Sequence, residues 1–319
     1  MSWRLRVLAP AKINLGLFVG PRRAADGKHE LASVMQSISL ADVLTLEAGQ
    51  PDGGGLGGGD EVVCPGVRGP AGENLAALAL RLFRAETGWD GQALRLSIDK
   101  RIPVAAGLGG GSADAAAALR LVERLSGRGS RELLRDLAAR LGADVPAQLV
   151  PGRWLASGTG ERLHELAPAE QPFGVLVLAL AAKLSAGAVY ARLDELGGGR
   201  PGTDLEEVEH RLRAAYESGA PVAETPELLH NDLQGPAISL CPEIGAVLDE
   251  ALGAGADAAF VSGSGPTVVG LFVGADGPER ARRAATRLAG REPAASWATP
   301  VEQGLAAVHD IDVRHNPRR

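Results

Sequence analysis

A glycine-rich loop around residues 107–111 is the part of the sequence best suited to chemistry. It follows a predicted strand over residues 92–100 and opens a predicted alanine-rich helix. Glycine has no Cβ, so backbone N–H groups come close to a ligand, and a helix start adds unpaired donors and a positive dipole end. These features predict an anion site suited to a phosphate chain. The residues assigned to this site are Pro103, Val104, Ala105, Ala106, Gly107, Leu108, Gly109, Gly110, Gly111, Ser112, Ala113 and Asp114.

Two familiar nucleotide-binding loops do not fit these letters. A P-loop requires Gly-Lys-Ser/Thr, and this loop contains no lysine. A dinucleotide-binding fingerprint requires a third glycine where Ser112 stands, and it follows the first strand of its fold. A plain turn is the competing interpretation of the glycines. Ser112, at the predicted helix start, either caps that helix or faces a phosphate or its magnesium ion.

Lys12 and Asn14 form a second polar group. Residues 3–8 and 10–19 are predicted to be two strands, and in the second strand period two places Lys12, Asn14 and Gly16 on one face. The opposite face then carries Ile13, Leu15 and Leu17. A strand whose other face is core therefore presents a lysine beside an asparagine, although a solvent-facing lysine explains the pattern equally well.

Asp144 is the third candidate. It follows a predicted helix over residues 131–141 that ends at Gly142, within the letters Gly-Ala-Asp-Val-Pro. The negative end of a helix dipole disfavours a carboxylate at this position. Aspartate is also a common turn residue. Asp144 is therefore either an ordinary turn residue or a carboxylate with a role in catalysis.

Composition narrows the class of protein. The chain has 319 residues, 45% of them hydrophobic, which suffices for one large domain or two ordinary ones. A net charge of −6 without a basic stripe argues against a nucleic-acid partner. The two cysteines, Cys64 and Cys241, suggest neither a zinc site nor a disulfide framework. We found neither a signal-peptide pattern nor an apolar run of membrane-spanning length, so we expect a cytoplasmic protein without a membrane partner.

The order of predicted elements changes near residues 168–172. Before this point, strands are predicted over residues 3–8, 10–19, 33–47, 92–100 and 153–156, and helices over residues 73–87, 112–125 and 131–141. Residues 51–59 are predicted to be a flexible, glycine-rich insertion. Beyond it, strands over 173–181, 258–262 and 267–273 and helices over 185–196, 204–218, 243–252 and 278–288 suggest a ferredoxin-like α+β layer. The two late strands are joined by the glycine turn Ser-Gly-Ser-Gly-Pro at residues 262–266.

Taken together and in order, these blocks resemble the GHMP small-molecule kinase superfamily. The resemblance covers residues 5–275 and rests on six blocks: A-P-A-K-I-N-L at 9–15, D-G-K-H-E-L at 26–31, G-L-G-G-G-S-A-D-A-A at 107–116, G-A-D-V-P at 142–146, H-N-D-L at 230–233 and S-G-S-G-P-T at 262–267. It implies an α+β fold of two domains. The first is a ribosomal-protein-S5-like domain over residues 1–168 and the second a ferredoxin-like domain over 169–300. A tail over 301–319 is expected to be disordered.

The resemblance also implies an ATP-dependent kinase. Asp144 matches the family's catalytic carboxylate, which takes the proton of the attacking hydroxyl, and Lys12 matches its lysine partner. A neighbouring ammonium stabilises the charged form of a carboxylate and helps to orient an alcohol. The loop over residues 103–114 is expected to wrap the ATP phosphates, with Ser112 nearest the phosphates and a Mg²⁺ ion.

The blocks at 26–31 and 142–146 are most similar to the members that phosphorylate the 2-hydroxyl of 4-diphosphocytidyl-2-C-methyl-D-erythritol. The implied acceptor is this small molecule, and the expected assembly is a monomer or a weak homodimer. The residues matching acceptor positions are Asn14, Lys28, His29, Tyr190, Gly263 and Ser264. At position 28 this chain has a lysine, where members of the family usually have an aromatic residue that stacks on the base. Another GHMP kinase, acting on homoserine, mevalonate or a sugar, and a ligand sensor on the same fold are the alternatives.

Overall fold

Two long antiparallel strands, β1 (Arg4–Arg22) and β2 (His29–Ala48), form the centre of the N-terminal part of the computed structural model. The structure describes residues 3–49, 59–67, 74–217, 219 and 225–311. Within these residues, β1 and β2 belong to a seven-stranded sheet of order β11-β1-β2-β4-β3, in which β5 pairs with β2 and β6 with β5. The other strands of this sheet are β3 (Glu61–Val63), β4 (Leu94–Asp99), β5 (Arg153–Gly158), β6 (Arg162–Leu166) and β11 (His309–Asp310).

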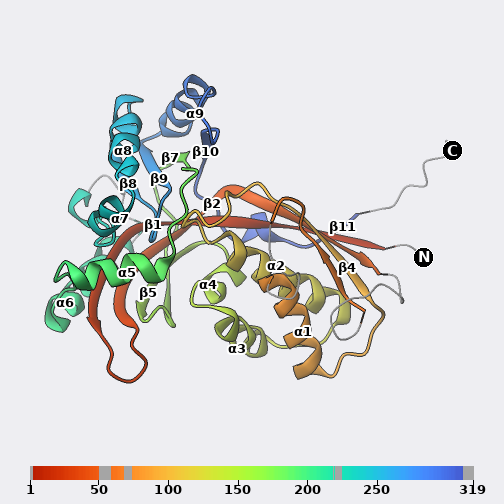
Figure 1. The fold of residues 1–319 in the computed structure, drawn as a ribbon. Helices are drawn as coiled ribbons and strands as arrows, with labels where there is room; N and C mark the ends of the chain where they lie inside the picture. The colour runs from red at the N-terminus through yellow and green to blue at the C-terminus, as the bar shows by residue number, and fades with distance from the viewer. Residues whose placement is uncertain (1–2, 50–58, 68–73, 218, 220–224, 312–319) are drawn as a thin grey trace.

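Four helices cover one side of this sheet (Figure 1). They are α1 (Leu75–Thr87), α2 (Gly110–Ser126), α3 (Arg131–Leu141) and α4 (Val145–Leu149). The side chains of Asn74 and Ser130 cap the first turns of α1 and α3 by accepting hydrogen bonds from backbone N–H groups. Helix α2 buries a run of alanines from Ala115 to Ala118. These small side chains let α2 lie close against the sheet, so the loop before it is held firmly.

A second sheet of order β10-β7-β9-β8 follows in the chain. Its strands are β7 (Phe173–Leu178), β8 (Ala258–Val261), β9 (Val268–Val273) and β10 (Ser296–Ala298). Its helices are α5 (Ala186–Glu195), α6 (Gly202–Glu217), the short 3₁₀ turn η3 (Pro226–Leu228), α7 (Gln234–Leu240), α8 (Glu243–Gly253) and α9 (Gly277–Arg287). The predicted helices and strands of this half are present, and the α+β class is confirmed.

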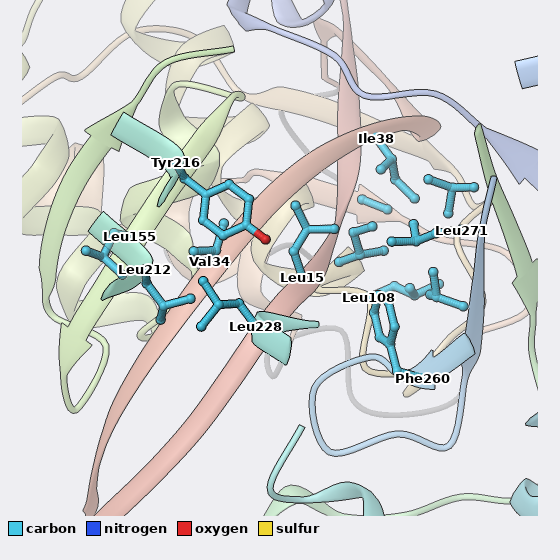
Figure 2. Close-up of a cluster of buried hydrophobic side chains, with 14 of the residues drawn as sticks. Leu15, Val34, Ile38, Leu108, Leu155, Leu212, Tyr216, Leu228, Phe260 and Leu271 are labelled. Carbon is cyan, nitrogen blue, oxygen red and sulfur yellow. The ribbon is translucent and has the colours of Figure 1, made fainter. Parts of the chain in front are cut away.

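The glycine loop is anchored in a hydrophobic cluster that joins the two sheets. Figure 2 shows Leu108 in one group with Phe260 and Leu271 of the second sheet, and Leu15 of the first sheet between this group and Val34. Leu108 belongs to the glycine loop and is 1% exposed. Burying a leucine side chain is worth roughly 1.5–3 kcal/mol. The loop is therefore fixed at the junction of the two sheets.

Strand β1 differs from the prediction in two ways. The two predicted strands are one, with register shifts between Pro10 and Ala11 and between Asn14 and Gly16. A β-bulge adds a residue and reverses the alternation of side chains beyond it. As a result, Leu17 does not share a cluster with Leu15, as period two predicts, but packs with Val19 in a separate one. Leu17 thus comes to lie on the side of Lys12 and Asn14.

Residues 301–311 do not form the expected tail. They contain the 3₁₀ turn η4 (Gln303–Ala306) and strand β11, which pairs with β1 through Leu5 and Asp310. The edge of β1 offers unpaired backbone groups, and β11 satisfies them. Residues 312–319 of the predicted tail and residues 51–58 of the predicted glycine-rich insertion lie outside the described residues. Among the described helices, none has both the length and the apolar character needed to cross a membrane.

Candidate active site

Lys12 and Asp144 come together although they are far apart in the sequence. Lys12 projects from β1, and Asp144 stands immediately before α4. Lys12 Nζ lies 3.4 Å from Asp144 Oδ2, with side-chain exposures of 9% and 38%. The predicted pairing of the two residues is thus present in the structure. The carboxylate remains open to solvent, whereas the ammonium is nearly buried beneath it.

The remaining contacts of Lys12 fix its direction. Lys12 Nζ donates to Asn14 Oδ1 at 2.8 Å. Asn14 Nδ2 in turn donates to Ser33 Oγ at 2.7 Å, and Ser33 Oγ donates to the Gly16 carbonyl at 2.7 Å. Since Asn14 and Ser33 are both buried, this chain holds the ammonium in one position. An ammonium held in this way keeps one side available to a group placed next to Asp144.

The glycine loop lies directly against Lys12. The Lys12 N–H donates to the Leu108 carbonyl at 2.9 Å. Gly109 precedes α2 as its N-cap and has the left-handed conformation, with φ 68°. A Cβ at this glycine would stand 2.9 Å from Lys12 Cγ. Both the backbone conformation and the close approach of Lys12 therefore require glycine at this position.

Two cavities meet at this loop. One, here called the Lys12 cavity, has a volume of about 490 Å³ and is lined by Lys12 and Asp144. The other, here called the loop cavity, has a volume of about 350 Å³ and is lined by the glycine loop. Gly107, Gly109 and Ser112 line both. A ligand in the loop cavity can therefore reach one in the Lys12 cavity at these residues.

The structure brings together nearly all of the predicted site residues. Those from Pro103 to Ser112, and also Asp114, line the loop cavity. Ala113 does not, because it faces inward from α2 and packs in the core. The residues predicted to contact an acceptor all line the Lys12 cavity: Asn14, Lys28, His29, Tyr190, Gly263 and Ser264.

An aromatic pair forms part of the wall of the Lys12 cavity. The rings of His29 and Tyr190 are stacked, with centroids 5.3 Å apart and planes 28° apart. His29 Nδ1 lies 3.1 Å from the Gly20 carbonyl, and Nε2 lies 3.0 Å from Asp194 Oδ1. Burial, assisted by the charge of Asp144, raises the pKa of the Tyr190 hydroxyl to about 12. The tyrosine is therefore neutral, and the pair presents a flat surface that suits a planar ligand group.

A buried charged cluster in the wall of the loop cavity was not predicted. Lys100 Nζ contacts Asp42 and lies 2.9 Å from Asp114 Oδ2. Asp42 Oδ1 also accepts hydrogen bonds from the N–H groups of Arg101 and Ile102. Lys100 and Asp114 line the loop cavity, as does Cys64. The sequence offered one signal, an aspartate at position 114 in the first turns of an otherwise apolar helix, where a buried carboxylate requires a partner.

The turn between β8 and β9 closes the Lys12 cavity from the second sheet. Gly263 has φ 58°, and a Cβ there would stand 3.2 Å from the Gly107 carbonyl and 3.6 Å from Lys12 Nζ. Ser262 Oγ donates to the Gly107 carbonyl at 3.2 Å. The two glycine loops of the chain are therefore in contact above Lys12.

Comparison with known proteins agrees with this geometry. The model of the GHMP kinases N-terminal domain matches residues 74–152, and that of the GHMP kinases C-terminal domain matches residues 204–292. A protein of Anaeromyxobacter dehalogenans named 4-diphosphocytidyl-2-C-methyl-D-erythritol kinase is 42% identical, over 99% of this chain and 93% of its own length. One of the same name from Leifsonia xyli is 42% identical, over 85% of this chain and 88% of its own.

A solved structure gives the same result. The crystal structure of a 4-(cytidine 5'-diphospho)-2C-methyl-D-erythritol kinase superposes with a TM-score of 0.70 and is 34% identical. The match covers 92% of this chain and 98% of that one. The chain belongs to the GHMP kinases and, within them, to the 4-diphosphocytidyl-2-C-methyl-D-erythritol kinase family.

Proposed function

We propose that the protein transfers the terminal phosphoryl group of ATP to the 2-hydroxyl of 4-diphosphocytidyl-2-C-methyl-D-erythritol, giving the 2-phosphate and ADP. The observation that carries this proposal is the Lys12–Asp144 pair, 3.4 Å apart, in a cavity that adjoins the glycine loop. The names of the relatives supply the acceptor. The reaction is that of the non-mevalonate route to isopentenyl diphosphate.

Asp144 is the proposed base. Its exposed carboxylate accepts the proton of the acceptor hydroxyl as the hydroxyl oxygen bonds to the terminal phosphorus, and the bond from that phosphorus to the ADP oxygen breaks. The ammonium of Lys12 lies beside this carboxylate and orients the hydroxyl. Phosphoryl transfer depends mostly on alignment and charge neutralisation. A lysine held by Asn14 and Ser33 supplies both, because its charge cannot move away.

The loop cavity is the proposed nucleotide site. Backbone N–H groups at the start of α2 and the positive end of its dipole face the space where phosphates would lie. Protein sites for Mg²⁺ usually supply one or two oxygen ligands and leave the others to water and substrate phosphates. The described residues contain no group of three or more metal-ligating side chains, and Ser112 lines both cavities. Ser112 therefore fits a Mg²⁺ held mainly by phosphates, which neutralises their charge when bound.

The wall of the Lys12 cavity is the proposed acceptor site. The stacked His29 and Tyr190 rings present a flat face for the cytosine. Asn14, Gly263 and Ser264 lie near Lys12, where the methylerythritol hydroxyls would lie. Lys28 lines the same cavity. It puts a cation where members of the family usually have an aromatic residue that stacks on the base. We expect this exchange to affect cytidine affinity more than phosphoryl transfer.

The decisive experiment measures ADP release with a panel of acceptors. The panel contains 4-diphosphocytidyl-2-C-methyl-D-erythritol, mevalonate, homoserine and galactose, each with ATP and Mg²⁺. Turnover with the cytidyl compound alone is the expected result. Turnover with one of the other three alone would overturn the acceptor assignment and leave the kinase chemistry standing. No turnover with any of them, despite nucleotide binding, would favour a ligand sensor.

A further inference from the structure

The segment His230–Leu233 has no role in the chemistry proposed above, yet it lies against both halves of the site. The Leu17 N–H donates to the His230 carbonyl at 2.8 Å, and the Asp232 N–H donates to the Leu17 carbonyl at 2.9 Å. The segment thus pairs with β1 as a short parallel bridge between Leu17 and Asn231. It is fastened to the strand that carries Lys12.

The Asn231 side chain connects this segment to the turn between β8 and β9. Asn231 is 5% exposed. Its Nδ2 donates to the carbonyls of Val261 and Gly263, each at 2.7 Å, and its Oδ1 accepts from the Leu233 N–H at 2.9 Å. Both amide protons are therefore used on one turn. A buried side chain that satisfies two carbonyls of one turn fixes the orientation of their peptide planes.

The second of these bonds determines where an N–H group points. In a trans peptide the carbonyl and the following N–H lie on opposite sides. With the Gly263 carbonyl held on Asn231, the Ser264 N–H points away from Asn231. Within the described part of the chain this N–H has no hydrogen-bond partner. Gly263 and Ser264 both line the Lys12 cavity, and Gly263 stands above Lys12 and Gly107.

We propose that Asn231 is a positioning residue for phosphoryl transfer. It orients the 263–264 peptide so that the Ser264 N–H donates a hydrogen bond to an oxygen of the phosphoryl group during its transfer. The proposal rests on the proposed kinase reaction. The location agrees with the role, because the turn contacts Gly107, one of the residues shared by the two cavities. A donor fixed before the reaction stabilises charge in the transition state without reorganisation.

The test measures kcat and KM of the Asn231→Asp variant as a function of pH. A neutral carboxyl at this position donates one hydrogen bond to the two carbonyls, whereas a carboxylate repels both. Burial between carbonyl oxygens raises the pKa of such an acid, so the loss grows as the acid ionises with rising pH. We expect kcat to fall about tenfold at pH 6 and about a hundredfold at pH 8.5, with smaller changes in both KM values. Dividing by the wild-type kcat at each pH removes the pH dependence that the two proteins share.

Gln234→Leu is the matched control. Gln234 Oε1 accepts from the Val261 N–H at 3.0 Å, so this variant loosens the same turn without freeing the Gly263 carbonyl. We expect its kcat to stay within about threefold of wild type, which corresponds to the loss of one ordinary hydrogen bond. Equal losses in the two variants would overturn the proposal, as would a loss confined to the KM for the acceptor or one independent of pH.

A second variant covers the case in which Asn231→Asp does not fold. Asn231→Ser keeps one donor and no carboxylate, so it should lose kcat without the pH dependence, and wild-type kcat in it would overturn the proposal. Failure of the proposed function is distinguishable, because the comparison uses whichever acceptor the wild-type enzyme turns over. A wild-type enzyme with no turnover on the whole panel would overturn both.

Discussion

Two lysine–aspartate groups flank the glycine loop, and they differ in how far their carboxylates are open to solvent. In the first, Lys12 and Asp144 stand 3.4 Å apart and the Asp144 side chain is 38% exposed. In the second, Lys100 contacts both Asp42 and Asp114, and the Asp42 side chain is fully buried. The first group opens into the Lys12 cavity, whereas the second forms part of the wall of the loop cavity.

The difference separates a pair that can accept a substrate from a cluster that holds a structure together. Asp42 accepts two backbone N–H groups as well as the lysine, so it has little capacity left for a ligand. Through these bonds Asp42 connects β2 to the residues that follow β4. Lys100, one of those residues, also contacts Asp114 and so connects them to α2. Asp144 has no such set of partners. A hydroxyl group can therefore approach the exposed side of this carboxylate, next to Lys12.

The largest effect is expected from Asp144→Asn. The amide cannot take a proton, so turnover should fall by about 10²–10⁴-fold, the usual contribution of a positioned base. ATP should still bind, because Asp144 does not line the loop cavity. ADP release measures the first expectation and nucleotide titration the second. A variant with near-normal turnover would show that another group accepts the proton.

Substitutions in the second group, Lys100 with Asp42 and Asp114, should change the stability of the folded protein. Asp42→Ala leaves Lys100 with one carboxylate and frees two backbone N–H groups, so we expect a loss of about 3–5 kcal/mol in the free energy of unfolding. Urea unfolding measures it. Asp99→Ala is the control, since Asp99 forms a solvent-exposed pair with Arg101 at 3.0 Å and should cost at most about 1 kcal/mol. Similar losses in the two variants would remove the distinction between the two lysine–aspartate groups.

The same cluster predicts a pH dependence. Burial raises the pKa of the Asp114 carboxyl from 3.8 to about 7, with Lys100 opposing the shift and Asp42 adding to it. Between about pH 4 and 7 the unfolded chain has released this proton while the folded chain retains it. Its contribution to stability therefore falls as pH rises, by up to about 1.4 kcal/mol per unit.

Asp114→Asn isolates this contribution, because the amide does not titrate. The free energy of unfolding of the variant, minus that of wild type, should increase by about 1–2 kcal/mol from pH 5 to pH 7. Urea unfolding of both proteins at several pH values measures the difference, in which the other titrating groups cancel. A difference that is constant with pH would mean that the Asp114 carboxyl is ionised throughout this range.

The contrast between the two groups also shows what the sequence could reveal. Local spacing marked the glycine loop, Lys12 and Asp144 as candidates, but it left a plain turn and a solvent-facing lysine open. The resemblance to the GHMP kinases is what paired Lys12 with Asp144. The Lys100 cluster was not predictable, since Asp42 and Lys100 meet only when β2 pairs with β4, 58 residues apart in the chain. The position of Leu17 was missed for a related reason. A bulge between Asn14 and Gly16 depends on the register with β2 and leaves no mark in the alternation of residues.

The smallest expected effect concerns the acceptor alone. Lys28 lines the Lys12 cavity but not the loop cavity, so Lys28→Tyr changes one site without touching either lysine–aspartate group. Stacking on a base is worth about 1–3 kcal/mol, so the new ring should lower the KM for the cytidyl acceptor about fivefold or more. The KM for ATP and kcat should hardly change. Lys28→Met removes the charge without adding a ring, so it should not tighten binding. An unchanged or raised KM in the tyrosine variant, or an equal gain in the methionine variant, would show that the base does not stack at position 28.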